Sequence, residues 1–248
     1  MKWCAKCDLV VAGMAGCLVG SDFLPSALAE PQQECVVLIH GLGRTSRSMK
    51  RLEWALAKTG YHVINISYPS TRLPVEESCD RHLGPALKER VPDSAARVHF
   101  VTHSLGGILL RQYLSGHHIP NLGNVVMLAP PNQGSEVADW MRRSWVGRLI
   151  LGKSGRQLGT APEDLPKRLG PVQFRLGVIA GDRSWNPLFS AIIPGPDDGK
   201  VSVESTKVEG MNDFIVIHSS HTWIMCRHEP IRQATFYLEH GRFDQPSK

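Results

Sequence analysis

The apolar residues of this chain fall into short continuous runs, separated by segments in which they recur at helical spacing. Runs rich in β-branched residues occupy positions 35–39, 62–66, 98–101, 125–128, 176–179 and 214–217. Continuous runs of this length are typical of strands that are buried on both faces, as in a parallel sheet. The pattern therefore predicts six strands.

The segments between these runs have the spacing of helices. We expect a helix that carries Met49, Leu52 and Leu56 and ends near Gly60, and further helices over about 75–90, from Leu105 onward, and over about 229–240. Alternating strands and helices predict the α/β class, with a mostly parallel sheet of about six strands and helices on both faces. In such sheets ligands bind beyond the carboxyl ends of the strands. Residues from about 132 to 171 are too many for a bare loop and are expected to form a helical insert.

The first thirty residues have a different pattern. Leu9–Val19 is an apolar run about as long as a signal-peptide core, Lys2 and Lys6 precede it, and Ala27-Leu28-Ala29 offers a cleavage site before Glu30. We expect residues 1–29 to be a signal peptide and residues 30–248 to be an exported domain. A buried N-terminal helix is the alternative.

A second processing route is weaker in the sequence. Met14-Ala15-Gly16-Cys17 resembles a lipoprotein processing box, but its first residue is Met instead of the usual Leu. A lipid anchor at Cys17 is therefore the less favoured expectation.

Length and charge limit the remaining classes. The chain has 248 residues, enough for one domain, and a net charge of +5 that is spread along the sequence without a basic run. This charge favours loose attraction to anionic surfaces over recognition of nucleic acid. The three cysteines after the leader, Cys35, Cys79 and Cys226, lack zinc-site spacing and allow at most one disulfide.

The strongest local motif is Thr102-His103-Ser104-Leu105-Gly106-Gly107, between a predicted strand and a predicted helix. A sharp strand-to-helix turn exposes a serine hydroxyl to a base, and small neighbours let the turn close. We therefore predict that Ser104 is a nucleophile. Thr102 stands where the G-x-S-x-G pattern has its first glycine, and an N-cap role for Ser104 is the alternative.

A second glycine-rich segment, His40-Gly41-Leu42-Gly43, follows the first predicted strand. Its glycines leave the backbone free to turn an N–H toward the same edge of the sheet. Acyl transfer needs such donors for the oxyanion of its tetrahedral intermediate. The N–H groups of Leu42 and Leu105 are the candidates.

The base and its orienting acid should follow the nucleophile in the chain. Of the histidines after the sixth strand, His221 is favoured because it lies in a small-residue loop at the carboxyl edge. His218, which continues the strand and is expected to be half-buried and structural, and His228 remain alternatives.

Three aspartates compete for the role of the acid. Asp198 is favoured because it precedes a glycine and a short apolar patch. Asp182 ends the fifth strand, where the adjacent Arg183 offers an ion pair, and it remains an alternative together with Asp197.

With these residues assembled, the chain resembles a compact α/β-hydrolase of the bacterial lipase and esterase kind. The resemblance extends over nearly all of residues 35–240 and is most specific at the segments around Leu42 and Ser104, and at Asp198-Gly199-Lys200-Val201 followed by Ser220-His221-Thr222. It implies a triad of Ser104, Asp198 and His221, with Leu42 and Leu105 as oxyanion donors. It also implies the hydrolysis of carboxylic esters, which together with the expected signal peptide predicts an exported esterase or lipase.

No metal or organic cofactor is implied, and the expected partner is a small ester or lipid, with peripheral contact to a lipid surface as a further expectation. A thioesterase, an amidase or an acyltransferase would use the same groups. A non-catalytic lipid-binding protein with this fold is the alternative from another class.

The insert has two interpretations of its own. Val137, Trp140, Met141, Trp145 and Leu149 share one face of a helix over residues 135–151, and Ser135 is its candidate N-cap. This helix either packs on the sheet or forms a lid that lines an acyl pocket or touches lipid.

Overall fold

The computed structural model describes residues 33–245. The predicted signal peptide over residues 1–29 and the processing box at Cys17 lie outside the described residues. Within residues 33–245, no helix is long and apolar enough to span a bilayer.

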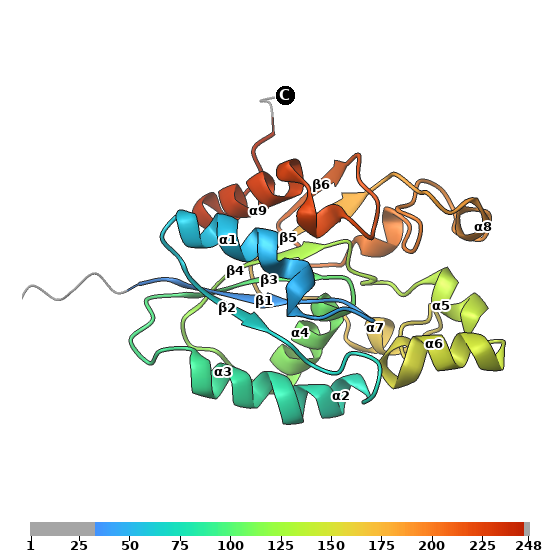
Figure 1. Ribbon diagram of the computed structural model, residues 1–248, viewed down its shortest axis with the longest axis horizontal. Coiled ribbons are helices and arrows are strands. Elements are labelled where there is room, and N and C mark those ends of the chain that lie inside the picture. Colours follow the sequence, from blue (N-terminus) through green and yellow to red (C-terminus); the bar gives the residue numbers. More distant parts are fainter. Residues whose placement is uncertain (1–32, 246–248) are drawn as a thin grey trace, which may run out of the picture. The chain divides into compact units, whose positions relative to one another are not determined.

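Six parallel strands form one sheet in the order β2-β1-β3-β4-β5-β6 (Figure 1). The prediction of a parallel sheet of about six strands is therefore confirmed. Each strand corresponds to one of the apolar runs: β1 (Cys35–Ile39), β2 (His62–Ile66), β3 (Val98–His103), β4 (Leu122–Leu128), β5 (Leu176–Gly181) and β6 (Asp213–Ile217).

The pairing of β1 with β3 brings two distant motifs together. Ile39 and Thr102, which stand near the carboxyl ends of these strands, are partners in the register. The segment that begins at His40 and the segment that contains Ser104 therefore leave the sheet side by side.

Helices cover both faces of the sheet, as predicted (Figure 1). One face carries α1 (Lys50–Lys58) and α9 (His228–His240), whose buried residues pack on Val36 and Leu38 of β1. The other face carries α2 (Val75–Ser78), a π-helical turn (Cys79–Leu83), α3 (Gly84–Arg90) and α4 (Leu105–Gly116), which pack on Val37 and Ile39. Alternate residues of β1 thus point to opposite apolar layers, which explains its continuous apolar run.

The insert between β4 and β5 differs from the expected single helix over 135–151, so that expectation was wrong. It contains α5 (Glu136–Met141), α6 (Trp145–Gly155) and α7 (Leu165–Arg168). Ser135 caps α5 by accepting the N–H of Ala138, as expected, but Ser144 caps a second helix by accepting the N–H of Gly147. This second cap ends the periodic pattern, because an N-cap residue has an extended rather than a helical backbone.

The consequence is that the expected apolar face does not exist as one surface. Val137 is buried, whereas Trp145 and Leu149 on α6 are exposed. The remaining short helices are α8 (Pro187–Ser190) and three 3₁₀ turns (Ser46–Met49, Glu204–Thr206 and Ile224–Cys226). Cys35, Cys79 and Cys226 are free thiols in the described chain.

Candidate active site

The strand-to-helix turn at Ser104 has a strained backbone. Ser104 has φ 52° and ψ −124°, a left-handed conformation that a serine adopts only when its surroundings force it. It stands between the last residue of β3 and the first residue of α4. A Cβ on Gly106 would lie 2.5 Å from the carbonyl oxygen of Ile39, so only glycine lets α4 start this close to β1.

Thr102 fits at the position where the motif usually has glycine. It is fully buried in β3, and its Oγ1 lies 3.3 Å from the place where a Cβ of Gly107 would be. The missing side chain at Gly107 therefore provides the room that Thr102 needs, and the sharp turn forms despite the departure.

Ser104, His221 and Asp198 form one chain of hydrogen bonds. The Nε2 atom of His221 lies 2.9 Å from Oγ of Ser104, and its Nδ1 atom lies 2.7 Å from Oδ2 of Asp198. The three residues are 7%, 5% and 2% exposed. The structure thus brings together the three residues that the sequence favoured as nucleophile, base and acid.

Asp198 is held by the loop that follows it. Its Oδ1 atom accepts the backbone N–H groups of Lys200 and Val201 at 3.0 and 2.9 Å, which leaves Oδ2 for the imidazole. The backbone N–H of His221 also donates to the carbonyl oxygen of Asp198. These bonds fix the carboxylate with one oxygen directed at Nδ1 of His221.

The alternative acids and bases lie elsewhere. His218 and Asp182 pair with each other at 3.0 Å on the surface, with side chains 71% and 36% exposed, so His218 is not half-buried as expected. The expected Arg183–Asp182 ion pair does not form, and the guanidinium of Arg183 stacks on Trp185 instead. Asp197 accepts bonds from Ser190, at the end of α8, and from the backbone N–H of Gly199 in its own loop. His228 is exposed at the start of α9.

The segment after β1 is held in place by Tyr68. The backbone N–H of Tyr68 donates to Nε2 of His40, and its hydroxyl donates to the carbonyl oxygen of His40. Because Nε2 accepts, the proton of the neutral imidazole lies on Nδ1, which donates to the carbonyl oxygen of Gly41 at 3.0 Å. This bond orients the Gly41–Leu42 peptide group, which carries the N–H of Leu42.

The two predicted oxyanion donors have N–H groups without a partner in the described chain. Gly43 and Arg44 donate to Ser70 and to the carbonyl oxygen of Gly41, whereas Leu42 donates to no described group. Leu105 is the first residue of α4, where an N–H has no carbonyl acceptor within its helix. Both groups are therefore available as donors at the edge where Ser104 stands.

Residue-type and spacing arguments did not assign functions to His40, Tyr68 or His103. His103 is 2% exposed, and its Nε2 donates to the backbone carbonyl of His221 at 3.0 Å. Burial, and secondarily the nearby His221, lowers the pKa of His103 well below the ordinary value. Burial also lowers the pKa of His40. In the sequence, the only feature that pointed to His40 and His103 was their position next to the predicted site residues.

An apolar cleft opens beside His221. It has a volume of about 360 Å³, and its walls include Trp185, Phe189 and Trp223 as well as Asp198 and His221. On the insert, Trp140 makes an edge-to-face contact with Phe189, with ring centroids 6.0 Å apart. Trp185, Phe189 and Trp223 thus border the space next to the imidazole, and Trp140 supports Phe189 from the insert.

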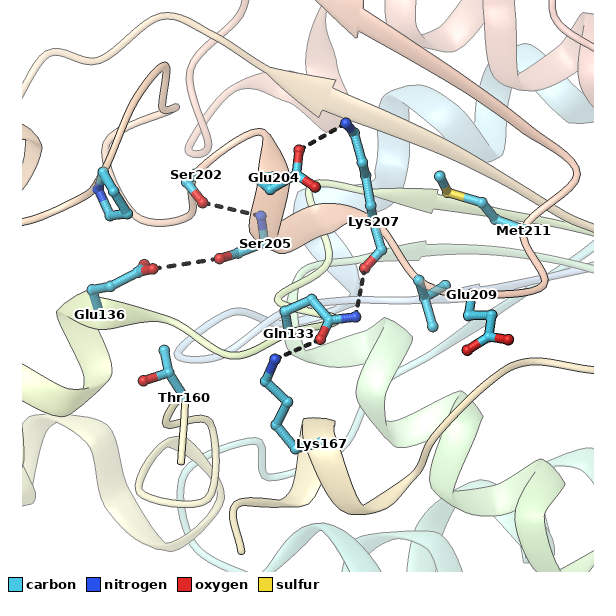
Figure 2. Close-up of a pocket in the computed structure, with 12 residues that line it drawn as sticks. Gln133, Glu136, Thr160, Lys167, Ser202, Glu204, Ser205, Lys207, Glu209 and Met211 are labelled. Carbon is cyan, nitrogen blue, oxygen red and sulfur yellow. Dashed lines mark hydrogen bonds and ion pairs between the residues drawn. The ribbon is translucent and has the colours of Figure 1, made fainter. Parts of the chain in front are cut away.

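A second cavity, of about 640 Å³, contains none of the three residues of the hydrogen-bonded chain (Figure 2). Its polar side chains mostly bond to one another: Lys167 to Gln133, Lys207 to Glu204, and Ser205 to Glu136. Two bonds, from Ser205 to Glu136 and from Ser135 to the carbonyl oxygen of Lys200, join the segment after β4 to the segment that follows Asp198. They therefore support the loop that carries the carboxylate.

Within residues 33–245, no group of three or more His, Cys, Asp or Glu side chains could hold a metal ion. At the carboxyl edge, Ser104, His221 and Asp198 form one hydrogen-bonded relay. Such a relay can move a proton from the hydroxyl of Ser104 to the imidazole of His221, and the carboxylate of Asp198 stabilises the imidazolium that results.

Comparisons with known proteins agree with this architecture. A family model described as "Alpha/beta hydrolase family" matches residues 36–232. No curated protein matches the chain in a sequence search. Many solved structures match the chain in a structure search.

Three solved structures illustrate the likeness. Lipase BlEst2 of Bacillus licheniformis, in its mature form, is 18% identical with a TM-score of 0.60, over 79% of this chain and 88% of that one. Phospholipase PlaB of Legionella pneumophila is 17% identical with a TM-score of 0.61, over 76% and 53%. A metagenomic carboxyl esterase, MGS0156, is 15% identical with a TM-score of 0.62, over 86% and 76%.

At these identities the solved structures establish the fold, and the family model covers most of the chain. The predicted resemblance is therefore confirmed at the level of the family. The chain belongs to the alpha/beta hydrolase family.

Proposed function

We propose that this protein is a serine hydrolase that cleaves carboxylic esters through an acyl-enzyme. One observation carries the proposal: the unbroken sequence of hydrogen bonds from Ser104 through His221 to Asp198, with atom separations of 2.9 and 2.7 Å. Hydrolysis of this type needs a nucleophile, a base within hydrogen-bond reach of it, and a group that orients the base.

In the acylation step, Oγ of Ser104 attacks the ester carbonyl carbon while Nε2 of His221 takes the hydroxyl proton. Asp198 holds Nδ1–H of the imidazole and stabilises the positive charge that forms, without itself becoming protonated. The tetrahedral intermediate then collapses. The imidazolium returns its proton to the departing alcohol oxygen, and the acyl group remains on Ser104.

In the deacylation step, the same imidazole removes a proton from water, whose oxygen attacks the acyl carbon. The carboxylic acid leaves, and the proton returns to Oγ of Ser104. In both steps the carbonyl oxygen gains negative charge. The N–H groups of Leu42 and Leu105 would hold this oxyanion, and the loss of one such donor costs about 3–4 kcal/mol of transition-state stabilisation.

The walls of the cleft favour an ester with an apolar acyl group. Trp185, Phe189 and Trp223 border the space next to His221. Burial of acyl methylenes against these aromatic side chains would stabilise the bound ester. The names of the structural neighbours, which include a lipase, a phospholipase and a carboxyl esterase, are consistent with a lipid or small ester as substrate.

The proposal is tested by the hydrolysis of p-nitrophenyl esters. Ser104→Ala should lower turnover by several orders of magnitude and leave the fold intact, because the change removes only one hydroxyl. Ser115→Ala, at an exposed serine near the end of α4, is the control and should leave turnover unchanged. Equal ester hydrolysis by wild type and Ser104→Ala would exclude the proposed mechanism.

We further propose that the protein is exported and that residues 1–29 are removed. The support is the pattern of charged, apolar and small residues in that segment. Mass spectrometry of the protein from its native host should find Glu30 as the first residue. A diacylglyceryl group on Cys17 would identify a lipoprotein instead.

A further inference from the structure

Helix α6 has an uncovered apolar side. Trp145, Val146, Leu149 and Ile150 are exposed by 72%, 45%, 72% and 60%, and their spacing places them on one face of the helix. The other side packs into the molecule through Leu151, which is buried. A contiguous exposed apolar surface of this kind marks an interaction site.

The charged side chains that α6 and its flanking residues carry are all basic. Residues 142–157 contain no aspartate or glutamate, whereas Arg143, Arg148, Lys153 and Arg156 are all exposed. In the part of the chain that the structure describes, none of these four side chains forms an ion pair. Their positive charge is therefore available to an anionic partner.

The apolar and basic groups converge on a single groove. It has a volume of about 510 Å³, and its walls combine Trp145 and Leu149 with Arg148, Lys153 and Arg156. A partner that fits this groove has negatively charged groups next to apolar groups. A phospholipid headgroup region offers both, since its phosphates lie directly above the acyl chains.

The C-terminal end of α6 lies against the segment that holds the oxyanion donor. A Cβ on Gly155 would lie 2.8 Å from Cδ2 of Leu42, and the backbone N–H of Lys153 donates to the carbonyl of Thr71 at 2.8 Å. One end of α6 is thus fixed beside Leu42, while Trp145 at the other end extends into solvent. Figure 1 shows α6 beside α5.

From these observations we propose that α6 docks the protein onto an anionic phospholipid bilayer. Trp145, Leu149 and their apolar neighbours enter the interface between headgroups and acyl chains, and the flanking arginines and lysine bind lipid phosphates. A nucleic acid would engage the same positive charge but would gain nothing from four exposed apolar side chains. A protein partner could cover the apolar side chains without being negatively charged, so it would not account for the four basic side chains.

The test uses protein as its native host produces it, together with two kinds of vesicle. One kind is pure phosphatidylcholine, and the other contains phosphatidylcholine and phosphatidylglycerol in equal parts. The ratio of the two dissociation constants, measured by vesicle flotation, isolates the effect of anionic lipid from any contribution of the N-terminal segment. Wild type should bind the anionic vesicles more tightly, and added salt should weaken that preference.

Two sets of substitutions separate the contributions. Arg148→Gln, Lys153→Gln and Arg156→Gln combined should weaken binding to anionic vesicles about 100-fold, since each charge near the surface changes affinity about fivefold. Trp145→Ala with Leu149→Ala should weaken binding to both kinds of vesicle. All five side chains are exposed, so the fold and the hydrolysis of a soluble short-chain ester should stay unchanged.

The matched control lies on the opposite face of the sheet. Helix α1 also carries an exposed tryptophan next to a lysine, Trp54 with Lys58 Nζ 3.4 Å from its ring centroid. Trp54→Ala with Lys58→Gln should bind vesicles as wild type does. Ser104→Ala should also bind normally, so this docking surface is tested independently of the proposed hydrolysis.

Any of three results with vesicles would overturn the proposal: equal binding to the two kinds of vesicle by wild type, an equal loss in the α1 and α6 variants, or an undiminished preference for anionic vesicles after the three Gln substitutions. Tight binding of duplex DNA without vesicle binding would assign the basic side chains to another partner and would also overturn it.

Discussion

The imidazole of His103 donates a hydrogen bond from Nε2 to the backbone carbonyl of His221, across 3.0 Å. The residue that precedes the candidate nucleophile therefore holds the loop that carries the candidate base, and the two rings lie with centroids 5.0 Å apart. This contact ties the turn after β3 to the loop after β6. A second proton on this imidazole would place an uncompensated charge at a buried site, so His103 is held in its neutral form.

We predict that acid destabilises the protein partly through His103. Its pKa in the folded state lies well below 6.5, the ordinary value for histidine, because burial and His221 disfavour the charged form. Below about pH 6.5 the unfolded chain therefore binds a proton at His103 that the folded chain does not bind. The free energy of unfolding consequently falls as pH falls. One such group contributes up to about 1.4 kcal/mol per pH unit.

The free energy of unfolding in urea, measured from neutral pH to about pH 5, tests this. His103→Asn removes the titration while keeping a side-chain N–H donor, so its slope against pH should be shallower than that of wild type. Some slope should remain, since burial also lowers the pKa of His40 and of His99. If the free energy of unfolding has the same slope against pH in wild type and in His103→Asn, His103 is excluded as a source of acid sensitivity.

We predict that Asp198 is the acid that orients His221. Asp198→Asn keeps the shape of the side chain but favours the wrong imidazole tautomer, and turnover should fall by up to about 10⁴-fold. Asp182→Asn should have little effect on turnover, because Asp182 pairs with the exposed His218. Steady-state kinetics on a short-chain ester compare the variants, and a crippled Asp182→Asn enzyme would contradict the assignment.

We predict that Trp140 influences the preferred acyl length. It packs on Phe189, which lines the cleft beside His221, and each acyl methylene that is buried against this wall is worth up to about 0.8 kcal/mol. Trp140→Ala should lower kcat/KM for medium-chain esters and spare acetate esters, which are too short to reach the wall.

A series of soluble p-nitrophenyl esters of increasing acyl length measures this effect. Trp145→Ala is the matched control, because this nearby tryptophan faces solvent on α6 and, among the described residues, makes no ring contact with Phe189 or another aromatic residue of the cleft. Its profile should follow that of wild type. A uniform loss at all chain lengths in Trp140→Ala, with a lower melting temperature, would mean that Trp140 only supports the fold.

The four inner strands could be predicted from sequence because each one is buried between two apolar layers. Val36 and Val37 in β1, for example, belong to the layers on opposite faces of the sheet, so both had to be apolar. The order β2-β1-β3 was not predicted residue by residue. It follows from pairings such as Ile39 with Thr102, which are determined by contacts between distant segments.

The insert could not be predicted because the same residues fit one helix or two. The periodic spacing of Trp140 and Trp145 favoured a single helix, but the hydroxyl of Ser144 caps a new one between them. In the site, glycine-rich turns and chain order pointed to Ser104, Asp198 and His221. The roles of His40 and Tyr68 depend on which ring nitrogen accepts a bond, and no sequence pattern encodes that.

The central claim is that Ser104 carries the acyl group, and covalent labelling tests it most directly. A fluorophosphonate probe reacts with a serine only where a neighbouring base activates the hydroxyl. Peptide mapping by mass spectrometry should find one equivalent of probe on Ser104, and no adduct after Ser104→Ala or after prior heat denaturation. An unlabelled Ser104 in folded protein, or an adduct on another serine, would contradict the account.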